Sequence, residues 1–273
     1  MDTVDHGTTS GTQFRRVVRP CSDWAGTLPR SPAVVLALCA LVSVHNAQAA
    51  ALVGQTIGEA FDQKSNELLY SETHCVSPDA LTREVIYRNP AEQLIAYKVL
   101  NYDTGLLTPS FVQHNVVPNS SIAIQWARDE VIITTSEGDS VPAVVALKPD
   151  EQYPLVVDAG FDAFVTGHWD SLVNGEARQF QFPVAAREAL VGLSIKSAPC
   201  SYDTDTDQCF RLELDNWLFR MVADHIELGY DAAQQRLSRF RGVSNISDGS
   251  GSGLAVDIHY RYDDLAGLQC DKS

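Results

Sequence analysis

The chain has 273 residues, of which 45% are hydrophobic and 20% are charged, so it is long and apolar enough to bury a core. Its 35 acidic residues outnumber its 20 basic residues and give a formal net charge of −15. A surface of this sign repels nucleic-acid phosphates and anionic lipid headgroups, so nucleic acid is not an expected partner.

The first 49 residues have the features of a secretory signal peptide with an extended N-terminal region. Four arginines precede an uncharged apolar run at 33–44, and Ala47-Gln48-Ala49 places small residues where a signal peptidase cleaves. The run is shorter than the roughly 20 apolar residues that a membrane-spanning helix needs. We expect cleavage after Ala49 and an exported protein, periplasmic or extracellular, that is not integral to the membrane. The alternative is that the run is a buried core helix.

Residues 50–273 are expected to form a single domain that is mainly β. Short apolar-rich runs alternate with turn residues, which is typical of antiparallel strands with short connections. In 254–262, apolar residues alternate with polar ones, which indicates one face on a core and one in water. Val144 and Val145 are consecutive apolar residues and would point to opposite faces of a strand, which favours a strand covered on both faces. We predict a large curved antiparallel sheet or partly open barrel, with strands at 55–61, 67–75, 81–88, 92–102, 110–117, 121–127, 130–136, 141–147, 210–214, 226–230 and 254–262.

One segment, 158–173, departs from the period of two. Asp158 can cap the start of a helix there, and Asn174-Gly175 can end it. We predict one amphipathic helix packed on the sheet, and a second short helical turn at 217–222. The apolar residues of the first helix recur at roughly helical spacing: Phe161, Phe164, Val165, Trp169 and Leu172.

Four cysteines follow residue 49, an even number that favours disulfides in an exported chain. Cys200 and Cys209 flank a polar loop between two strand-like runs, so we expect them to be bonded. Cys75 and Cys270 then pair by elimination and hold the C-terminal tail. Zinc binding by four thiolates is the alternative, but it lacks a Cys-x-x-Cys pair.

The predicted helix carries the sharpest catalytic candidates. His168 lies near the apolar stripe, and Asp162 precedes it. Such a pair can line a cleft where the helix meets the sheet and act in general acid–base catalysis. Trp169, beside them, is a candidate ligand contact. The alternative is a packed histidine whose ring satisfies a backbone carbonyl.

Alternating carboxylates at Asp203, Asp205 and Asp207 are a weak candidate for a Ca²⁺ site. They lack the glycine and the distal glutamate of an EF-hand loop, so a solvated acidic hairpin tip is the preferred interpretation. We predict neither a metal nor a cofactor.

Arg239, Arg241 and Asn245 share parity on one predicted strand. If they project together, they can bind a carboxylate or a phosphate. The alternative is that the arginines pair with acids of neighbouring strands, such as Glu227 or Asp257.

Four runs carry a resemblance to known proteins: the segment from Tyr87-Arg88-Asn89-Pro90 to Ala96-Tyr97-Lys98, and the runs at 157–170, 226–230 and 239–246. Together they resemble exported proteins of Gram-negative bacteria without an assigned function. The resemblance covers most of 55–263 and contains no catalytic signature. The expected curved sheet is also similar in outline to periplasmic lipoprotein-carrier half-barrels, and fold alone does not determine function.

Three functions remain open. A binding or carrier module for an apolar or amphipathic ligand, such as a lipid, predicts a continuous apolar groove under the helix. A structural or assembly factor of the cell envelope predicts an exposed apolar patch or an open sheet edge. A periplasmic hydrolase predicts His168 at hydrogen-bond distance from a carboxylate. The carrier is preferred here, and an enzyme is least favoured because the usual catalytic motifs are missing.

Overall fold

The computed structural model describes residues 53–214, 225–247, 253–262 and 270. The expected signal peptide at 1–49 and the expected helical turn at 217–222 lie outside these residues.

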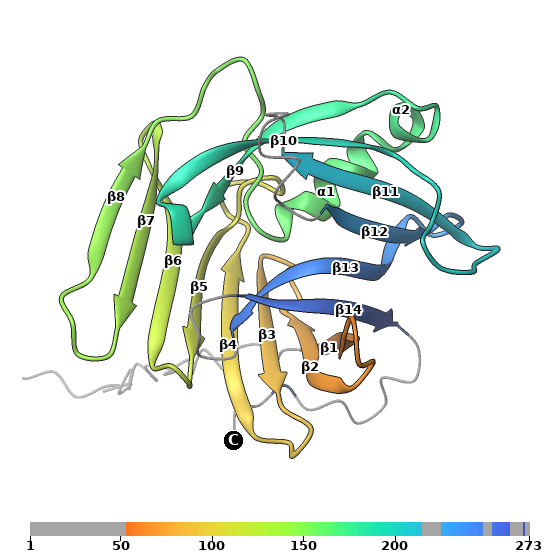
Figure 1. Ribbon diagram of the computed structural model, residues 1–273. Helices are drawn as coiled ribbons and strands as arrows, with labels where there is room; N and C mark the ends of the chain where they lie inside the picture. Colours follow the sequence, from red (N-terminus) through yellow and green to blue (C-terminus); the bar gives the residue numbers. More distant parts are fainter. Residues whose placement is uncertain (1–52, 215–224, 248–252, 263–269, 271–273) are drawn as a thin grey trace, which may run out of the picture. The chain divides into compact units, whose positions relative to one another are not determined.

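The described strands form one antiparallel sheet that stays open (Figure 1). Their order is β8-β7-β6-β5-β4-β3-β2-β1-β14-β13-β12-β11-β10-β9, so β8 and β9 are the two edges. The predicted curved, open antiparallel sheet is thereby confirmed. The bounds are β1 Val53–Asp62, β2 Leu68–Val76, β3 Thr82–Arg88, β4 Leu94–Asn101, β5 Ser110–Asn115, β6 Ser120–Ala127, β7 Glu130–Glu137, β8 Ala143–Leu147, β9 Arg178–Val184, β10 Ala189–Ser197, β11 Asp207–Leu214, β12 Ile226–Asp231, β13 Arg236–Ser247 and β14 Gly253–Arg261.

Strands that are neighbours in the sheet are also consecutive in the chain, except for β1 and β14, which pair in the middle of the sheet. The period-two alternation sets the faces, as in β14, where Val256 and Ile258 are buried and His259 is exposed. Asp257 lies on the same face as His259 but is buried, and it is ion-paired with Arg239 of β13. Edge strand β9 was not among the predicted strands, although Phe180 and Phe182 alternate with glutamines. Its Pro183 is compatible with a strand because β9 lies at an edge.

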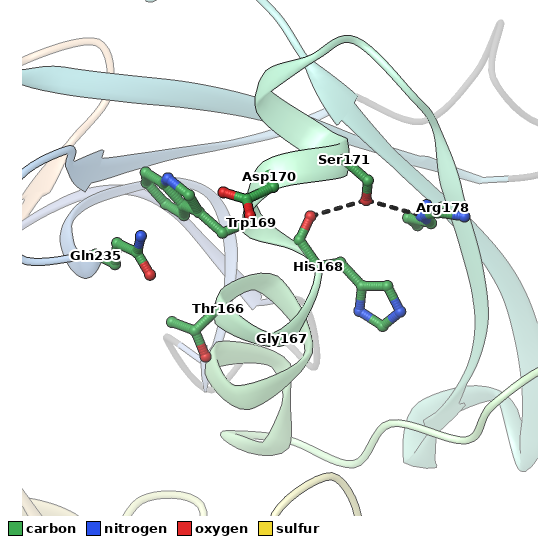
Figure 2. A pocket seen from close by; sticks show the side chains of 8 residues that line it. All are labelled: Thr166, Gly167, His168, Trp169, Asp170, Ser171, Arg178 and Gln235. Carbon is green, nitrogen blue, oxygen red and sulfur yellow. Dashed lines mark hydrogen bonds between the residues drawn. The ribbon is translucent and has the colours of Figure 1, made fainter.

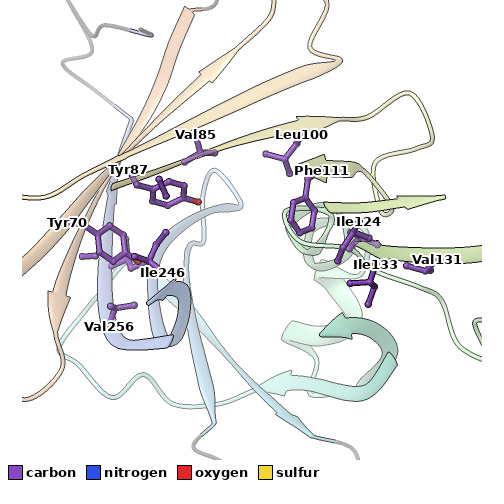
Figure 3. Close-up of a cluster of buried hydrophobic side chains, with 14 of the residues drawn as sticks. Tyr70, Val85, Tyr87, Leu100, Phe111, Ile124, Val131, Ile133, Ile246 and Val256 are labelled. Atoms are coloured by element: carbon purple, nitrogen blue, oxygen red, sulfur yellow. The ribbon is translucent and has the colours of Figure 1, made fainter. Parts of the chain in front are cut away.

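Two clusters of buried side chains form the core. The first covers β1–β7, β13 and β14 and includes Tyr70, Tyr87, Phe111 and Ile133 (Figure 3). The second joins the helical segment to β9–β12 and includes Phe164, Leu172 and Phe210. The helical segment therefore covers the part of the sheet formed by the C-terminal strands.

The predicted single helix is two helices, α1 (Gly160–Gly167) and α2 (Trp169–Val173), separated at His168. The expectation that Asp158 caps the start is wrong. Ala159 occupies the N-cap position, and Asp158 adopts a left-handed backbone with φ of 44°. Its carboxylate instead accepts a hydrogen bond from Lys98 Nζ at 2.7 Å. The predicted end is confirmed, since α2 stops before Asn174.

Both predicted disulfides are present, Cys75–Cys270 across 195 residues and Cys200–Cys209 across nine. None of the helices in the described part of the chain is long and apolar enough to cross a membrane.

Candidate functional site

A shallow pocket of about 410 Å³ lies where α1 meets α2 (Figure 2). It contains the two sequence candidates His168 and Trp169. Its walls are mostly polar and come from Thr166, Gly167, His168, Trp169, Asp170, Ser171, Arg178 and Gln235.

His168 is held by its own helix. Its Nδ1 donates to the carbonyl oxygen of Phe164 at 2.9 Å, and its ring lies 4.4 Å from the Phe164 ring. This is the packed arrangement that the sequence left as the alternative. Within the described ranges, no hydrogen bond or ion pair joins His168 to a carboxylate. The contact expected of a hydrolase is therefore missing from this part of the molecule.

Asp162 is exposed, but the protein around it raises the pKa of its carboxyl by desolvation. The Tyr230 hydroxyl and the charge of Arg83 oppose this rise.

Two other polar residues of the pocket, Ser171 and Arg178, are hydrogen-bonded to each other. Ser171 Oγ donates to the His168 carbonyl at 2.9 Å and accepts from Arg178 Nε at 3.0 Å. Arg178 Nη2 also donates to Glu176 at 2.7 Å. The guanidinium is thus already paired with a carboxylate of its own chain.

Trp169 packs against the sheet. Its ring meets Phe210 and Tyr230 edge-on, at centroid distances of 5.5 and 5.9 Å. Beneath the helices, Phe164, Leu172 and Phe180 are at most 1% exposed. The apolar groove expected there for a carrier is filled by these side chains.

Arg239 and Arg241 form an ion-pair cluster with Asp257. Arg239 makes two hydrogen bonds to the carboxylate, at 2.7 and 2.6 Å, and Arg241 Nε lies 3.3 Å from it. The Tyr202 ring also packs 3.9 Å from the Arg239 guanidinium. The alternative stated from the sequence is confirmed, because the arginines are occupied by a carboxylate of the neighbouring strand.

Asn245 does not project with the two arginines, so this part of the prediction is wrong. A register irregularity between Val243 and Ser247 in β13 breaks the alternation on which the prediction depended. The Asn245 amide instead donates to Gln113 Oε1 of β5 at 2.9 Å. It ties two distant strands together.

The three aspartates of the disulfide hairpin do not act together. Asp207 accepts hydrogen bonds from the Tyr202 hydroxyl and the Ser238 hydroxyl, both at 2.7 Å. Asp203 and Asp205 are exposed. In the described part of the chain, no group of three or more His, Cys, Asp or Glu residues is arranged to hold a metal ion.

The edges of the sheet provide a different kind of site. At β9, the protein covers the edge with its own chain: Gln181 N donates to the Pro154 carbonyl, and Val156 N donates to the Gln181 carbonyl, both at 2.9 Å. The Gln181 side chain holds the same segment through Asp150 and Tyr153. The segment thereby occupies this edge at Gln181, the middle residue of β9.

At β8, the edge is open within the described residues. β8 pairs with β7 on one side, and no other described segment makes a backbone hydrogen bond to it. Val144 is 63% exposed, so the expectation of a strand covered on both faces is wrong here. The reason is that β8 lies at the end of the sheet, as Figure 1 shows, where its outer face is not packed against another layer.

Further apolar side chains are exposed near the start of β8. Val116 and Val117 lie in the β5–β6 turn, and Val141 precedes β8. Their exposed fractions are 46%, 74% and 91%. The two turns are joined by a hydrogen bond from Gly138 N to the Asn119 carbonyl at 2.7 Å.

No protein-family model and no curated protein sequence matches this chain. Among solved structures, it is similar to a beta-barrel-like protein of the domain of unknown function DUF1849 from Brucella abortus. The two share 8% sequence identity with a TM-score of 0.46, over 77% of this chain and 95% of the other.

Proposed function

We propose that this protein is exported and acts as a structural or assembly factor of the cell envelope, which binds an extended segment of a partner polypeptide at β8. The open edge of β8 carries this proposal. The two disulfides support export, because such bonds persist in oxidising compartments.

An edge strand offers unpaired backbone N–H and C=O groups, and an extended peptide can pair with them as an additional strand. The five residues of β8 contain no charge that would oppose such pairing. Pro142 and Pro149 flank the strand, and proline cannot donate to a ladder. The added segment is therefore short, about five residues, and its binding is weak and reversible.

A second copy of the chain is a poorer occupant. Antiparallel pairing of all five β8 residues with themselves brings the Asp139 end of one copy toward Asp150 and Glu151 of the other. This happens at both ends of the pair by symmetry. Like charges brought together in this way destabilise a strand pair.

The test uses a seven-residue peptide of alternating valine and threonine, labelled for fluorescence anisotropy. Two further peptides carry backbone N-methyl groups at alternate residues, one at the odd and one at the even positions. The backbone N–H groups of successive residues in a strand point to opposite sides. Methylation of the N–H groups that face β8 should therefore weaken peptide binding at least about tenfold, and methylation of the N–H groups on the opposite side should leave binding unchanged. Equal binding of all three peptides, or no binding, contradicts strand addition.

Two protein variants locate the contact. Val144→Pro and Val145→Pro each remove one N–H, and the N–H groups of adjacent residues point to opposite sides of β8. We expect the variant whose lost N–H faces outward to lose peptide binding while its melting temperature is unchanged. The same substitution at Val243, on an inner strand, is the matched control and should lower stability instead. Peptide binding that survives both β8 variants contradicts the proposed site.

A further inference from the structure

The surroundings of β8 are strongly acidic. Residues 128–151 run from the β6–β7 turn through β8 and contain six acidic and two basic residues, a net charge of −4. All six acidic residues are exposed. The five residues of β8 are all uncharged.

The acids lie at both ends of the strand. At the end where β8 begins, Glu137 closes β7 and Asp139 follows in the turn. Where β8 ends, Val131 pairs with Leu147, so Glu130 and Asp129 lie beside the chain that leaves β8. That chain continues directly into Asp150 and Glu151.

The one basic residue that directly follows β8 does not offset this charge. Lys148 Nζ lies 3.3 Å from Asp129, and both side chains are more than half exposed. Together, Lys148 and Asp129 carry no net charge. Lys148 therefore does not neutralise the other acidic residues at the two ends of β8.

We propose that the segment bound at β8 is an apolar strand flanked on both sides by lysine or arginine residues. This inference rests on the proposed strand addition and names the chemistry of the partner. An uncharged centre on β8 fits apolar residues of the added strand, and acids at either end attract a basic residue at either end. An acidic or unflanked segment lacks this attraction, and the net charge of the protein repels an acidic one.

The experiment compares three peptides that share the valine–threonine centre and differ in two flanking residues at each end, which are lysine, glutamine or glutamate. At low salt, the lysine-flanked peptide should bind about tenfold more tightly than the glutamine-flanked peptide, because several exposed ion pairs each add a small favourable contribution. The glutamate-flanked peptide should bind most weakly. At about 0.5 M NaCl, screening should bring the three affinities together.

A charge-neutralised variant tests where the preference arises. The triple change Glu137→Gln, Asp139→Asn and Glu151→Gln should abolish the preference for lysine and leave binding of the glutamine-flanked peptide unchanged. The control variant, Glu92→Gln with Asp203→Asn and Asp205→Asn, changes the net charge equally at exposed sites away from β8 and should retain the preference.

The outcomes separate this inference from the proposed function. If the three peptides bind equally well and still lose affinity on N-methylation, strand addition stands and the inference about basic flanks is wrong. If the control variant loses the preference as fully as the β8 variant, the net charge of the whole protein is responsible and the inference is again wrong. If no peptide binds, both proposals fail.

Discussion

Asp257 is the residue on which the charged network of β13 and β14 depends. Burial opposes its ionisation, but its hydrogen bonds with Arg239 and the positive charges of Arg239, His259 and Arg241 outweigh that effect and hold its pKa below the usual range. Because the carboxylate is more acidic in the folded chain than in the unfolded chain, the network stabilises the fold only while Asp257 is ionised.

Replacing Asp257 with asparagine should therefore cost about 2 kcal/mol of unfolding free energy at neutral pH, since charged hydrogen bonds are lost and two arginines remain unpaired. The cost should be constant from pH 8 to about pH 5. It should shrink below about pH 4, where the unfolded chain begins to take up a proton at this position, and it should be lost once the pH falls below the lowered pKa of the folded carboxyl. Urea denaturation over this pH range measures it.

The exposed Asp205→Asn substitution is the matched control, and it should leave the unfolding free energy unchanged at neutral pH. A cost for Asp257→Asn that stays undiminished down to pH 3 contradicts the role given to its charge.

At the level of elements, α1 is seated against the chain that connects β4 and β5. Gly160, its first residue, meets the carbonyl group of Leu107, and a Cβ added there would overlap that backbone. The neighbouring Val157 N donates to the same carbonyl at 2.9 Å. The obstacle is backbone held by a hydrogen bond, so it cannot move aside as a flexible side chain can.

We predict that Gly160→Ala lowers the free energy of unfolding by about 1–3 kcal/mol through overpacking, in spite of the higher helix propensity of alanine. Gly167→Ala is the matched control in the same helix, because a Cβ there meets nothing within 4 Å. That variant should be neutral or more stable by up to about 1 kcal/mol. Thermal melting of both variants gives the comparison, and equal shifts would show that α1 is not seated in this way.

At the level of the whole molecule, the two disulfides differ in how much of the chain they enclose. Cys75–Cys270 joins β2 to the C-terminal region across 195 residues, whereas Cys200–Cys209 closes a hairpin across nine. In the chain-entropy account, the long loop restricts the unfolded chain more than the short one.

The double variant Cys75→Ser with Cys270→Ser should therefore lose about 5 kcal/mol of unfolding free energy, and the double variant Cys200→Ser with Cys209→Ser about 2.7 kcal/mol. Urea denaturation of the two variants, each with the other disulfide intact, provides the measurement. A larger loss for the short hairpin would mean that its contacts, such as Tyr202 against Arg239, outweigh chain entropy.

Much of the fold could be predicted from local pattern. Period-two alternation located most strands, and the even number of cysteines led to both disulfides. The position of the helical segment was predicted correctly, but its division into two helices at His168 was not predicted. The candidate site at the β8 edge was largely missed. The sequence analysis had pointed instead to His168, Trp169, Arg239 and Arg241, and these side chains are held by contacts within the protein.

The sequence by itself determined where most of the strands lie and that they pair antiparallel, because alternation and turn residues act between near neighbours in the chain. Only the tertiary structure decided which strands are neighbours, that Asn245 turns away from the arginines, and that the chain covers β9 but leaves β8 open within the described residues. These features depend on backbone hydrogen bonds between segments far apart in the sequence, such as Gln181 with Pro154, and no local pattern specifies them.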